Sequence, residues 1–300
     1  MKVNPVKIAV LPVAGLGTRV MPLTLHQPKA MIGIVDRPMV HYVIDEIVAA
    51  GIRHIIIVTK PNQPEFKKYL DFIKTDPEWR KSKVKIDLAV QKNPWGNGDA
   101  VFAARKYLKR RPFLVCFSDD LLVEKKPPMK TLIDLFNKTG SPTLALESVP
   151  IKSVSRYGVV AYPKWAESHA CRQAGKALIP ITDVVEKPTP SEAPSNLTII
   201  GRYVLTPAIL DEIGKLYPYH GKEIGLADAL KNYIYEGGRI YGWHFRGRRF
   251  DAGSMIGLMQ AQTYFGLHHK KLGKEFRKYL NESKYPSVKW QKSKAPTKRK

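Results

Sequence analysis

The segment KIAVLPVAGLGTRVMPLTLHQPKAM, residues 7 to 31, decides the fold class of this chain. It begins with a continuous apolar run that turns at Gly15 and Gly17. Arg19 follows the turn, and Lys29 comes ten residues after Arg19. A continuous apolar run before a Gly-rich turn is typical of a strand in a buried parallel sheet. Ligands of open α/β sheets bind where such strands end, so we expect a binding loop at this turn.

Helical and strand-like stretches alternate after this segment. MVHYVIDEIVAAG, from Met39, has its apolar residues at helical spacing, and PEFKKYLDFIK also reads as a helix. HIIIVT and FLVCFS read as buried strands. VKIDLAVQ alternates Val84, Ile86, Leu88 and Val90, which predicts a half-buried strand. This alternation favours a mostly parallel sheet that is covered by helices on both faces.

After residue 140 the pattern becomes β-rich. The strand-like stretches are TLALESVP, YGVVAYP, IPITDVVEKP, NLTIIGRYVL and RIYGWHF. Two helical stretches, PAILDEIGKLY and GLADALKNYIYEGG, precede the last of these strands, and a final helix is expected from about Ala252. We expect one α/β domain over residues 1–266, followed over 267–300 by a basic C-terminal helix and a flexible tail that ends in SKAPTKRK.

Composition narrows the classes of protein to consider. No segment reaches the roughly 18 apolar residues of a membrane span, so we expect none. Two cysteines, Cys116 and Cys171, do not make a disulfide framework, which suits a reducing, cytoplasmic setting. Cys116 lies in an apolar run and reads as a small buried residue. The net charge is +24, of which +10 falls in residues 267–300, and it suits an anionic ligand, a nucleic acid or an acidic membrane surface.

The Gly-rich turn can be interpreted from its residues alone. Gly15 and Gly17 have no side chains, so main-chain N–H groups there can approach a phosphate closely. Arg19 and Lys29 then form a cationic cradle for a polyphosphate. The spacing is neither that of a phosphate-binding P-loop nor that of a dinucleotide-binding turn. By itself, the turn could equally be a tight connection between a strand and a helix.

The string GLGTR, with PLT and PK after it, resembles the signature of the sugar-phosphate nucleotidyltransferases. PVAGLGTR followed by VDRPMVHYVIDEIVAAGI most resembles the bacterial UTP–glucose-1-phosphate uridylyltransferases. The resemblance covers roughly residues 5 to 266. It implies a Rossmann-like three-layer fold with a mixed, mostly parallel central sheet and a β-rich sugar-binding half. The nucleotide loop that it implies consists of Ala14, Gly15, Leu16, Gly17 and Thr18.

Further motifs extend this resemblance in the family's order. AVQKNPWGNGDAV implies that Gln91 and Gly96 lie beside the uracil. FSDD and FDAGSMIGLMQA imply that Asp119 and Asp251 bind Mg²⁺. RYGVV, VVEKP and IIGRYVL imply a group that holds the sugar phosphate, namely Gly158, Glu186, Lys187, Gly201, Arg202 and Tyr203.

This sequence departs from the family pattern in places. The segment between HIIIVTK and VKIDLAV is short, PKAM replaces the usual PKEM, and Asp99 stands where the family often has His. The basic tail has no counterpart in the resemblance. The family implies a homo-oligomer, either a dimer or a tetramer.

The implied reaction joins UTP and α-D-glucose 1-phosphate into UDP-glucose and releases pyrophosphate. The attacking phosphate is already an anion at neutral pH, so catalysis is an electrostatic problem. Arg19 and Lys29 would neutralise the β- and γ-phosphates, and Lys187 would hold the attacking phosphate. Mg²⁺, which prefers oxygen ligands, would lie between the two aspartates and the phosphates.

Several residues also have plainer interpretations. Asp119 and Asp120 could cap the turn that follows FLVCFS; the motif favours a metal role for Asp119 and leaves Asp120 as a cap. Asp251 could cap the last helix, and Gln91 could be an ordinary polar strand end. Glu186 and Lys187 could be a solvated pair. For Trp95 we expect packing and not a contact with the base.

Two alternative functions stay open. Thymidylyl transfer, or transfer to another sugar 1-phosphate, would need only a few changed residues near Gln91 and Glu186. A polyanion-binding protein on the same fold would explain the basic tail, but the aromatic residues do not alternate with basic ones as in single-strand binders. The acids and Lys187 are present, which favours an enzyme over a nucleic-acid partner.

Overall fold

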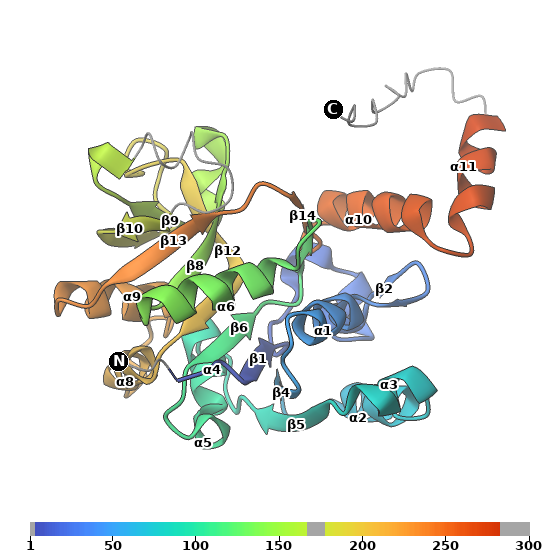
Figure 1. The fold of residues 1–300 in the computed structure, drawn as a ribbon, viewed down its shortest axis with the longest axis horizontal. Helices are drawn as coiled ribbons and strands as arrows, with labels where there is room; N and C mark the ends of the chain where they lie inside the picture. Colours follow the sequence, from blue (N-terminus) through green and yellow to red (C-terminus); the bar gives the residue numbers. More distant parts are fainter. Residues whose placement is uncertain (1–3, 167–177, 283–300) are drawn as a thin grey trace.

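The computed structural model describes residues 4–166 and 178–282 (Figure 1). Cys171 and the end of the predicted tail lie outside the described residues. Cys116 is fully buried, as predicted. Within the described ranges, no helix combines the length and apolar character that a membrane crossing needs.

Strand β1 (Ile8–Pro12) lies inside a large mixed sheet. All its residues are buried and almost all are apolar, as expected for a central strand. It runs parallel to β4 (His54–Thr59) on one side and to β6 (Phe113–Cys116) on the other. Strand β5 (Lys85–Val90) runs parallel to β4 and forms the edge of the sheet. This half of the sheet therefore has the all-parallel pattern that the continuous apolar runs predict.

The other half of the sheet contains antiparallel strands. Strand β12 (Leu197–Leu205) pairs antiparallel with β6 and, on its other side, with β8 (Thr143–Ser148). Strand β13 (Ile240–His244) runs parallel to β8, and β10 (Leu178–Ile181) runs antiparallel to β13 at the far edge. Thus β1, β4, β5, β6, β8 and β13 point one way, while β12 and β10 point the other way. The predicted mixed, mostly parallel α/β sheet is confirmed.

The fold also contains short antiparallel ribbons of two strands each, and two of these ribbons reach the candidate site. They are β9 (Gly158–Ala161) with β11 (Asp183–Glu186), β7 (Asp120–Val123) with β14 (Arg248–Asp251), and β2 (Gly33–Ile34) with β3 (Arg37–Pro38). The stretch IPITDVVEKP, which reads as one strand in the sequence, is therefore split between β10 and β11.

Helices cover both faces of the sheet, which gives the predicted three layers. One face carries α1 (Met39–Ala49), α2 (Pro64–Ile73), α3 (Pro77–Ser82), α6 (Pro128–Thr139) and α10 (Met255–His268). The other face carries α4 (Asn97–Ala103), α5 (Arg105–Leu108), α8 (Pro207–Lys215) and α9 (Leu226–Tyr235). Four 3₁₀ turns lie near the site: Thr18–Val20, Leu23–Leu25, Lys29–Met31 and Ile151–Arg156.

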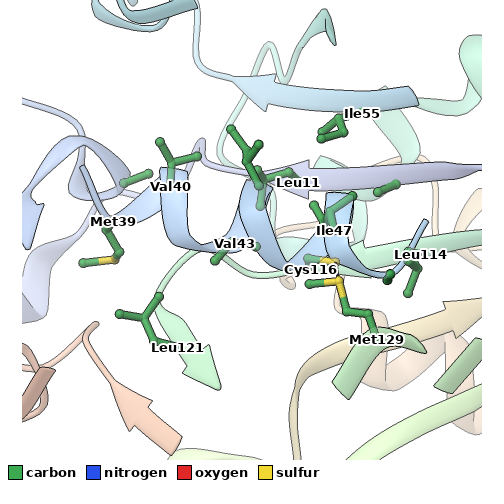
Figure 2. Packing of buried hydrophobic residues seen from close by; sticks show 14 of the residues in the cluster. Leu11, Met39, Val40, Val43, Ile47, Ile55, Leu114, Cys116, Leu121 and Met129 are labelled. Atoms are coloured by element: carbon green, nitrogen blue, oxygen red, sulfur yellow. Dashed lines mark hydrogen bonds between the residues drawn. The ribbon is translucent and has the colours of Figure 1, made fainter. Parts of the chain in front are cut away.

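Helix α1 shows how the apolar spacing is used. Its buried residues, which include Val43 and Ile47, pack against the apolar side chains of β1 and β6, and Figure 2 shows Leu11 and Cys116 among them. Gly51, at φ 92°, follows the helix in the left-handed conformation that favours glycine, as its position predicts.

Two expectations about single elements need correction. The alternating residues of β5 are not half-buried along its length, because Leu88 is 37% and Val90 is 49% exposed, while Ala89 is buried. Strand β5 is an edge strand. The face that carries the alternating apolar residues is covered by other parts of the chain only near the start of the strand. The last core helix begins at Met255, because Ser254 accepts a hydrogen bond from the N–H of Gly257 and caps it.

The predicted C-terminal helix is present as α11 (Gly273–Glu282), which packs against α10 and lies at the outer end of the molecule in Figure 1. Its contact with the rest of the chain is small. Phe276 lies close to Gly266 of α10, and Gly273 is the buried residue of α11.

Candidate active site

A cleft of about 570 Å³ opens where β1 and β6 end, and both halves of the chain line it. It brings together every residue predicted for the nucleotide, the sugar phosphate and the metal, apart from Arg202. These residues are Ala14, Gly15, Leu16, Gly17, Thr18, Arg19, Lys29, Gln91, Gly96, Asp119, Gly158, Glu186, Lys187, Gly201, Tyr203 and Asp251. Segments that are far apart in sequence therefore meet at one edge of the sheet, as expected for an open α/β fold.

The glycine loop after β1 requires a glycine at one position. Gly17 has φ 70°, and a Cβ there would lie 2.8 Å from Cγ2 of Thr24. The hydroxyl of Thr24 donates a hydrogen bond of 3.1 Å to the carbonyl oxygen of Gly17, which holds the loop closed. A Cβ on Gly15 would meet no atom within 4 Å, so its side of the loop is open to the cleft. The loop thus combines a tight turn with exposed main chain.

Two cations of this loop lie beside two carboxylates. The Nζ atom of Lys29 lies 2.6 Å from Oδ2 of Asp119. The guanidinium of Arg19 lies 3.6 Å from Asp119 and 3.4 Å from Oδ2 of Asp251, so it bridges both acids. Burial opposes ionisation of Asp119, but the charges of Lys29 and Arg19 outweigh it, and the pKa of Asp119 lies below its usual value. Asp119 is therefore an anion at neutral pH.

The two aspartates meet because their chain segments lie side by side. The N–H of Ala252 donates to the carbonyl oxygen of Asp119 at 2.8 Å, which continues the β7–β14 ribbon. A Cβ on Gly253 would lie 2.4 Å from Oδ2 of Asp119 and 3.1 Å from Oδ1 of Asp251. Nη2 of Arg19 would lie 2.7 Å from the same Cβ, so both carboxylates and this guanidinium face the small space beside the glycine.

This donor set fits a hard divalent cation. Two carboxylates from separate strands supply oxygen ligands, and Mg²⁺ commonly takes one or two protein carboxylates together with phosphate oxygens. Among the described residues, no group of three or more His, Cys, Asp or Glu side chains could hold a metal on its own. The arrangement therefore suits a magnesium ion that is shared with a phosphate substrate better than a zinc ion held by the protein alone.

The side of the cleft that the sequence predicts to hold the sugar is built on the β9–β11 ribbon. Gly158 lies opposite Glu186, and a Cβ on Gly158 would lie 3.1 Å from Oε2 of Glu186. Lys187 has φ 50°, an unusual conformation for a residue with a side chain, and its N–H donates to the carbonyl oxygen of Tyr157. Its Nζ atom lies 3.2 Å from Oε1 of Glu186. Strained backbone at such a position is common in binding sites.

The side of the cleft that the sequence predicts to hold the base lies at the end of β5. Gly96 has φ 132°, and a Cβ there would lie 2.5 Å from the carbonyl oxygen of Ile224. Gln91 is buried and lines the cleft. Trp95 stacks on Tyr219 with ring centres 5.0 Å apart and does not line the cleft, so the prediction that it packs is confirmed.

Asp120 is not the turn cap that the sequence suggests. It belongs to β7 and is 8% exposed. Its Oδ1 accepts a hydrogen bond of 2.6 Å from Arg249, and its Oδ2 accepts one of 2.8 Å from the N–H of Gly201. Asp120 therefore joins β7, β14 and β12 at the wall of the cleft, a role that depends on strands distant in sequence.

Arg202 does not lie beside the cleft, which corrects the expectation from the GRYVL motif. The alternation along β12 directs it to the face that carries α1, where it is fully buried. It lies 2.8 Å from Oε2 of Glu46 and donates to the carbonyl oxygens of Phe117 and Asp120. Its charge is thus paired inside the protein. Its hydrogen bonds stabilise the chain at the ends of the strands, from the face of the sheet that carries α1.

The sequence analysis did not name several of the lining residues, and Arg156 and Glu223 are two charged examples. Arg156 ends the 3₁₀ turn before β9, and its guanidinium lies 2.9 Å from Oδ2 of Asp251. Glu223 lines the cleft, and its Cγ lies near Gly96. Arg156 stands next to the RYGVV motif, so a search for cations beside each motif would have found it. Nothing in the local sequence marks Glu223.

Comparison with known proteins identifies the family of this chain. A family model described as nucleotidyl transferase matches residues 8–265. A UTP–glucose-1-phosphate uridylyltransferase of Haemophilus influenzae is 36% identical over 293 residues, covering 91% of this chain and 97% of that protein. A protein of the same description from Streptococcus pyogenes serotype M3 is 34% identical, covering 92% and 95%.

Solved structures of similar proteins share the fold. A UDP-glucose pyrophosphorylase complexed with UDP-glucose superimposes with a TM-score of 0.76 at 32% identity, covering 87% of this chain and 98% of its own. A UTP-bound UGPase from Acinetobacter baumannii gives a TM-score of 0.79 at 32% identity, covering 93% and 100%. The chain therefore belongs to the nucleotidyl transferase family, and it is similar over nearly its whole length to bacterial uridylyltransferases of that family.

Proposed function

We propose that this protein transfers the uridylyl group of UTP to α-D-glucose 1-phosphate, giving UDP-glucose and pyrophosphate. The observation that carries the proposal is the single cleft in which the glycine loop, both aspartates and the Glu186–Lys187 pair meet. Relatives described as uridylyltransferases, and a relative solved with UTP, support the choice of substrates. The setting that we propose is the reducing cytoplasm.

The chain's own residues address the repulsion between two anions. Arg19 and Lys29, on the loop after β1, line the cleft and would neutralise the β- and γ-phosphates of the nucleotide. Lys187, on the opposite ribbon, also lines the cleft and would hold the attacking phosphate. Because that phosphate is already ionised, no side chain has to remove a proton from it. The protein's contribution is to align two phosphates for in-line displacement and to balance their charge.

Asp119 and Asp251 would hold the metal, for which we propose Mg²⁺. When bound, the ion supplies further neutralisation of charge on the phosphate oxygens. The carboxylates face one small space, and Gly253 leaves room for it. Arg19 stands within 4 Å of both carboxylates, so it also helps to keep the two strand ends in register.

Glu186 lies at the end of β11 and lines the cleft, so it would accept hydrogen bonds from sugar hydroxyl groups. Gly158 and Gly201 keep the main chain close to the sugar, and Tyr203 forms the buried floor beside them. We assign the catalytic unit to residues 1–266, since no described residue after Asp251 lines the cleft.

We also propose that the chain forms a homo-oligomer, a dimer or a tetramer. Helix α10 is apolar around much of its circumference and exposes Met255, Ile256 and Met259. A helix without a polar face is commonly covered by another surface. Sedimentation at micromolar concentration measures this directly, and a strictly monomeric protein would contradict the proposal.

A screen of pyrophosphate release tests the function. The purified protein is given each of four nucleoside triphosphates with several sugar 1-phosphates and Mg²⁺. UTP with glucose 1-phosphate is expected to give the highest kcat/KM. A clearly higher value with dTTP would replace uridylyl by thymidylyl transfer, and no release with any pair would refute the proposal.

A further inference from the structure

The amide of Gln91 is held by two acceptors at the base side of the cleft. Its nitrogen lies 2.9 Å from the carbonyl oxygen of Gly96 and 2.7 Å from Oδ2 of Asp99. Gln91 and Asp99 are both buried, with 5% and 9% of their surface exposed. A carbonyl oxygen and an ionised carboxylate accept hydrogen bonds and donate none. Only the NH₂ end of the amide satisfies both neighbours, so chemistry fixes which way the Gln91 amide faces.

Asp99 is in turn fixed from its other side. The hydroxyl of Tyr217 donates a hydrogen bond to Oδ1 of Asp99. Burial raises the pKa of Tyr217, and the hydrogen bond to Asp99 raises it further, so the hydroxyl keeps its proton. The ring of Tyr217 packs at 5.1 Å from that of Phe102 and at 6.2 Å, edge-on, from that of Trp95. The carboxylate therefore faces a donor on each oxygen, Tyr217 at Oδ1 and Gln91 at Oδ2.

This arrangement leaves one polar atom of Gln91 for a ligand. Both N–H groups of the amide are used, and no residue in the described ranges donates to Oε1. Gln91 lines the cleft, whereas Asp99 and Tyr217 stand behind it and do not. A base that enters here meets a carbonyl oxygen, so the edge that it presents must offer a donor. Uracil carries a hydrogen on N3, and cytosine carries a lone pair at the same position.

We infer that Asp99 is a positioning residue that makes Gln91 present its carbonyl oxygen, and that this orientation selects uracil over cytosine. The inference rests on the proposed function and adds a physical reason for the choice of base. Asp99 acts through Gln91 and does not touch the nucleotide. Thymine carries the same N3–H group, so this contact separates UTP and dTTP from CTP and leaves the choice between UTP and dTTP to other residues.

Steady-state kinetics with UTP and CTP test the inference, using saturating glucose 1-phosphate. Asp99→Leu has a similar size but offers no acceptor, so only the carbonyl oxygen of Gly96 still holds the Gln91 amide in this orientation. The ratio of kcat/KM for UTP to that for CTP is expected to fall at least about tenfold, mainly through a higher KM for UTP. Asp99→Ala is measured beside it and is expected to give the same result, in case the leucine variant does not fold.

Tyr217→Phe is the matched control. It removes the donor to the other oxygen of the same carboxylate but leaves the acceptor that faces Gln91. The UTP to CTP ratio of this variant is expected to stay within about twofold of wild type, as for a substitution outside the recognition contact. Equal losses of selectivity in Tyr217→Phe and the Asp99 variants would show a general disturbance of the region and would overturn the inference.

A modified nucleotide tests the same contact without mutation. In 3-methyluridine triphosphate a methyl group replaces the N3 hydrogen, so wild-type kcat/KM is expected to be at least about tenfold lower than with UTP. Wild-type protein that uses both nucleotides equally well contradicts the inference, as do Asp99 variants with unchanged UTP to CTP ratios. If wild-type protein releases no pyrophosphate from UTP at all, the proposed function fails instead.

Discussion

The two halves of the cleft differ in what they present to a ligand. The half built on β1, β4, β5 and β6 presents mainly main chain, at Gly15, Gly17 and Gly96, with cations set around it. The half built on the β9–β11 ribbon presents side chains, above all Glu186 and Lys187. Parallel strands end in loops whose N–H groups are free, which suits phosphates, whereas a ribbon directs alternate side chains outward, which suits sugar hydroxyls.

Substitution of an aspartate at the junction of the two halves is expected to have the largest effect on turnover. Asp119→Ala removes a proposed metal ligand, and we expect kcat to fall on the order of 10³-fold with Mg²⁺, because a metal contributes several kcal/mol of charge stabilisation. The main-chain hydrogen bond from Ala252 stays, so circular dichroism should show a folded protein.

Asp134→Ala is the control, since Asp134 also pairs with a lysine, at 2.5 Å from Lys130, but on the exposed surface of α6. Exposed pairs contribute about 1 kcal/mol or less, so this variant should keep its turnover. Near-normal magnesium-dependent rates in Asp119→Ala would remove the metal assignment.

The sugar half is tested next by Lys187→Ala. Losing one charged partner of a phosphate is expected to lower kcat/KM for glucose 1-phosphate by about 10- to 100-fold. The KM for UTP should change little, because Arg19 and Lys29 are untouched. Lys130→Ala, a lysine removed from a helix surface outside the cleft, should leave both constants unchanged. Equal losses for both substrates would mean that Lys187 does not belong to the sugar half alone.

A substitution in β12, the strand between the two halves, is expected to have a smaller effect, which falls on stability. Gly201→Ala would place a Cβ 2.6 Å from Oδ2 of Asp120 and 2.9 Å from Cβ of Phe117. Crowding of this kind costs about 1–3 kcal/mol, so the midpoint of urea unfolding should fall. Gly33→Ala is matched, because its Cβ would meet nothing within 4 Å. Equal midpoints for the two variants would show that β12 tolerates more movement than this packing suggests.

Removing residues 270–300 should have the smallest effect on turnover. The removed segment includes α11 and carries much of the basic tail. In the part of the chain that the structure describes, no residue after Asp251 lines the cleft. We expect kcat/KM for both substrates to stay within about twofold of the full chain. A collapse of activity would mean that the tail belongs to the site or to assembly.

Much of the fold was predictable because one local rule, the spacing of apolar residues, was enough to predict most elements. The apolar run before Gly15 places β1, and the spacing of apolar residues in α1 and α2 places those helices. The rule failed for β5, where alternating apolar residues did not tell which face would be covered. Burial along an edge strand depends on how far the neighbouring helices extend, and that is a tertiary property.

The candidate site shows the same limit at single residues. Adjacent acids in FSDD have separate roles, because Asp119 points to the cleft and Asp120 joins three strands. Arg202 lies in a motif beside Gly201 but points to the opposite face of β12. Neighbours in a strand face opposite ways, so membership of a motif does not establish a place in the site.

By itself, the sequence determined the class of fold, the order of the binding segments and the residue types at the cleft, because these depend on local spacing and on family motifs. Only the tertiary structure decided which acids meet, that Arg202 is buried against Glu46, and that Asp99 stands behind Gln91. Those facts depend on contacts between strands and helices far apart in the chain, and no local pattern encodes the distance between two such side chains.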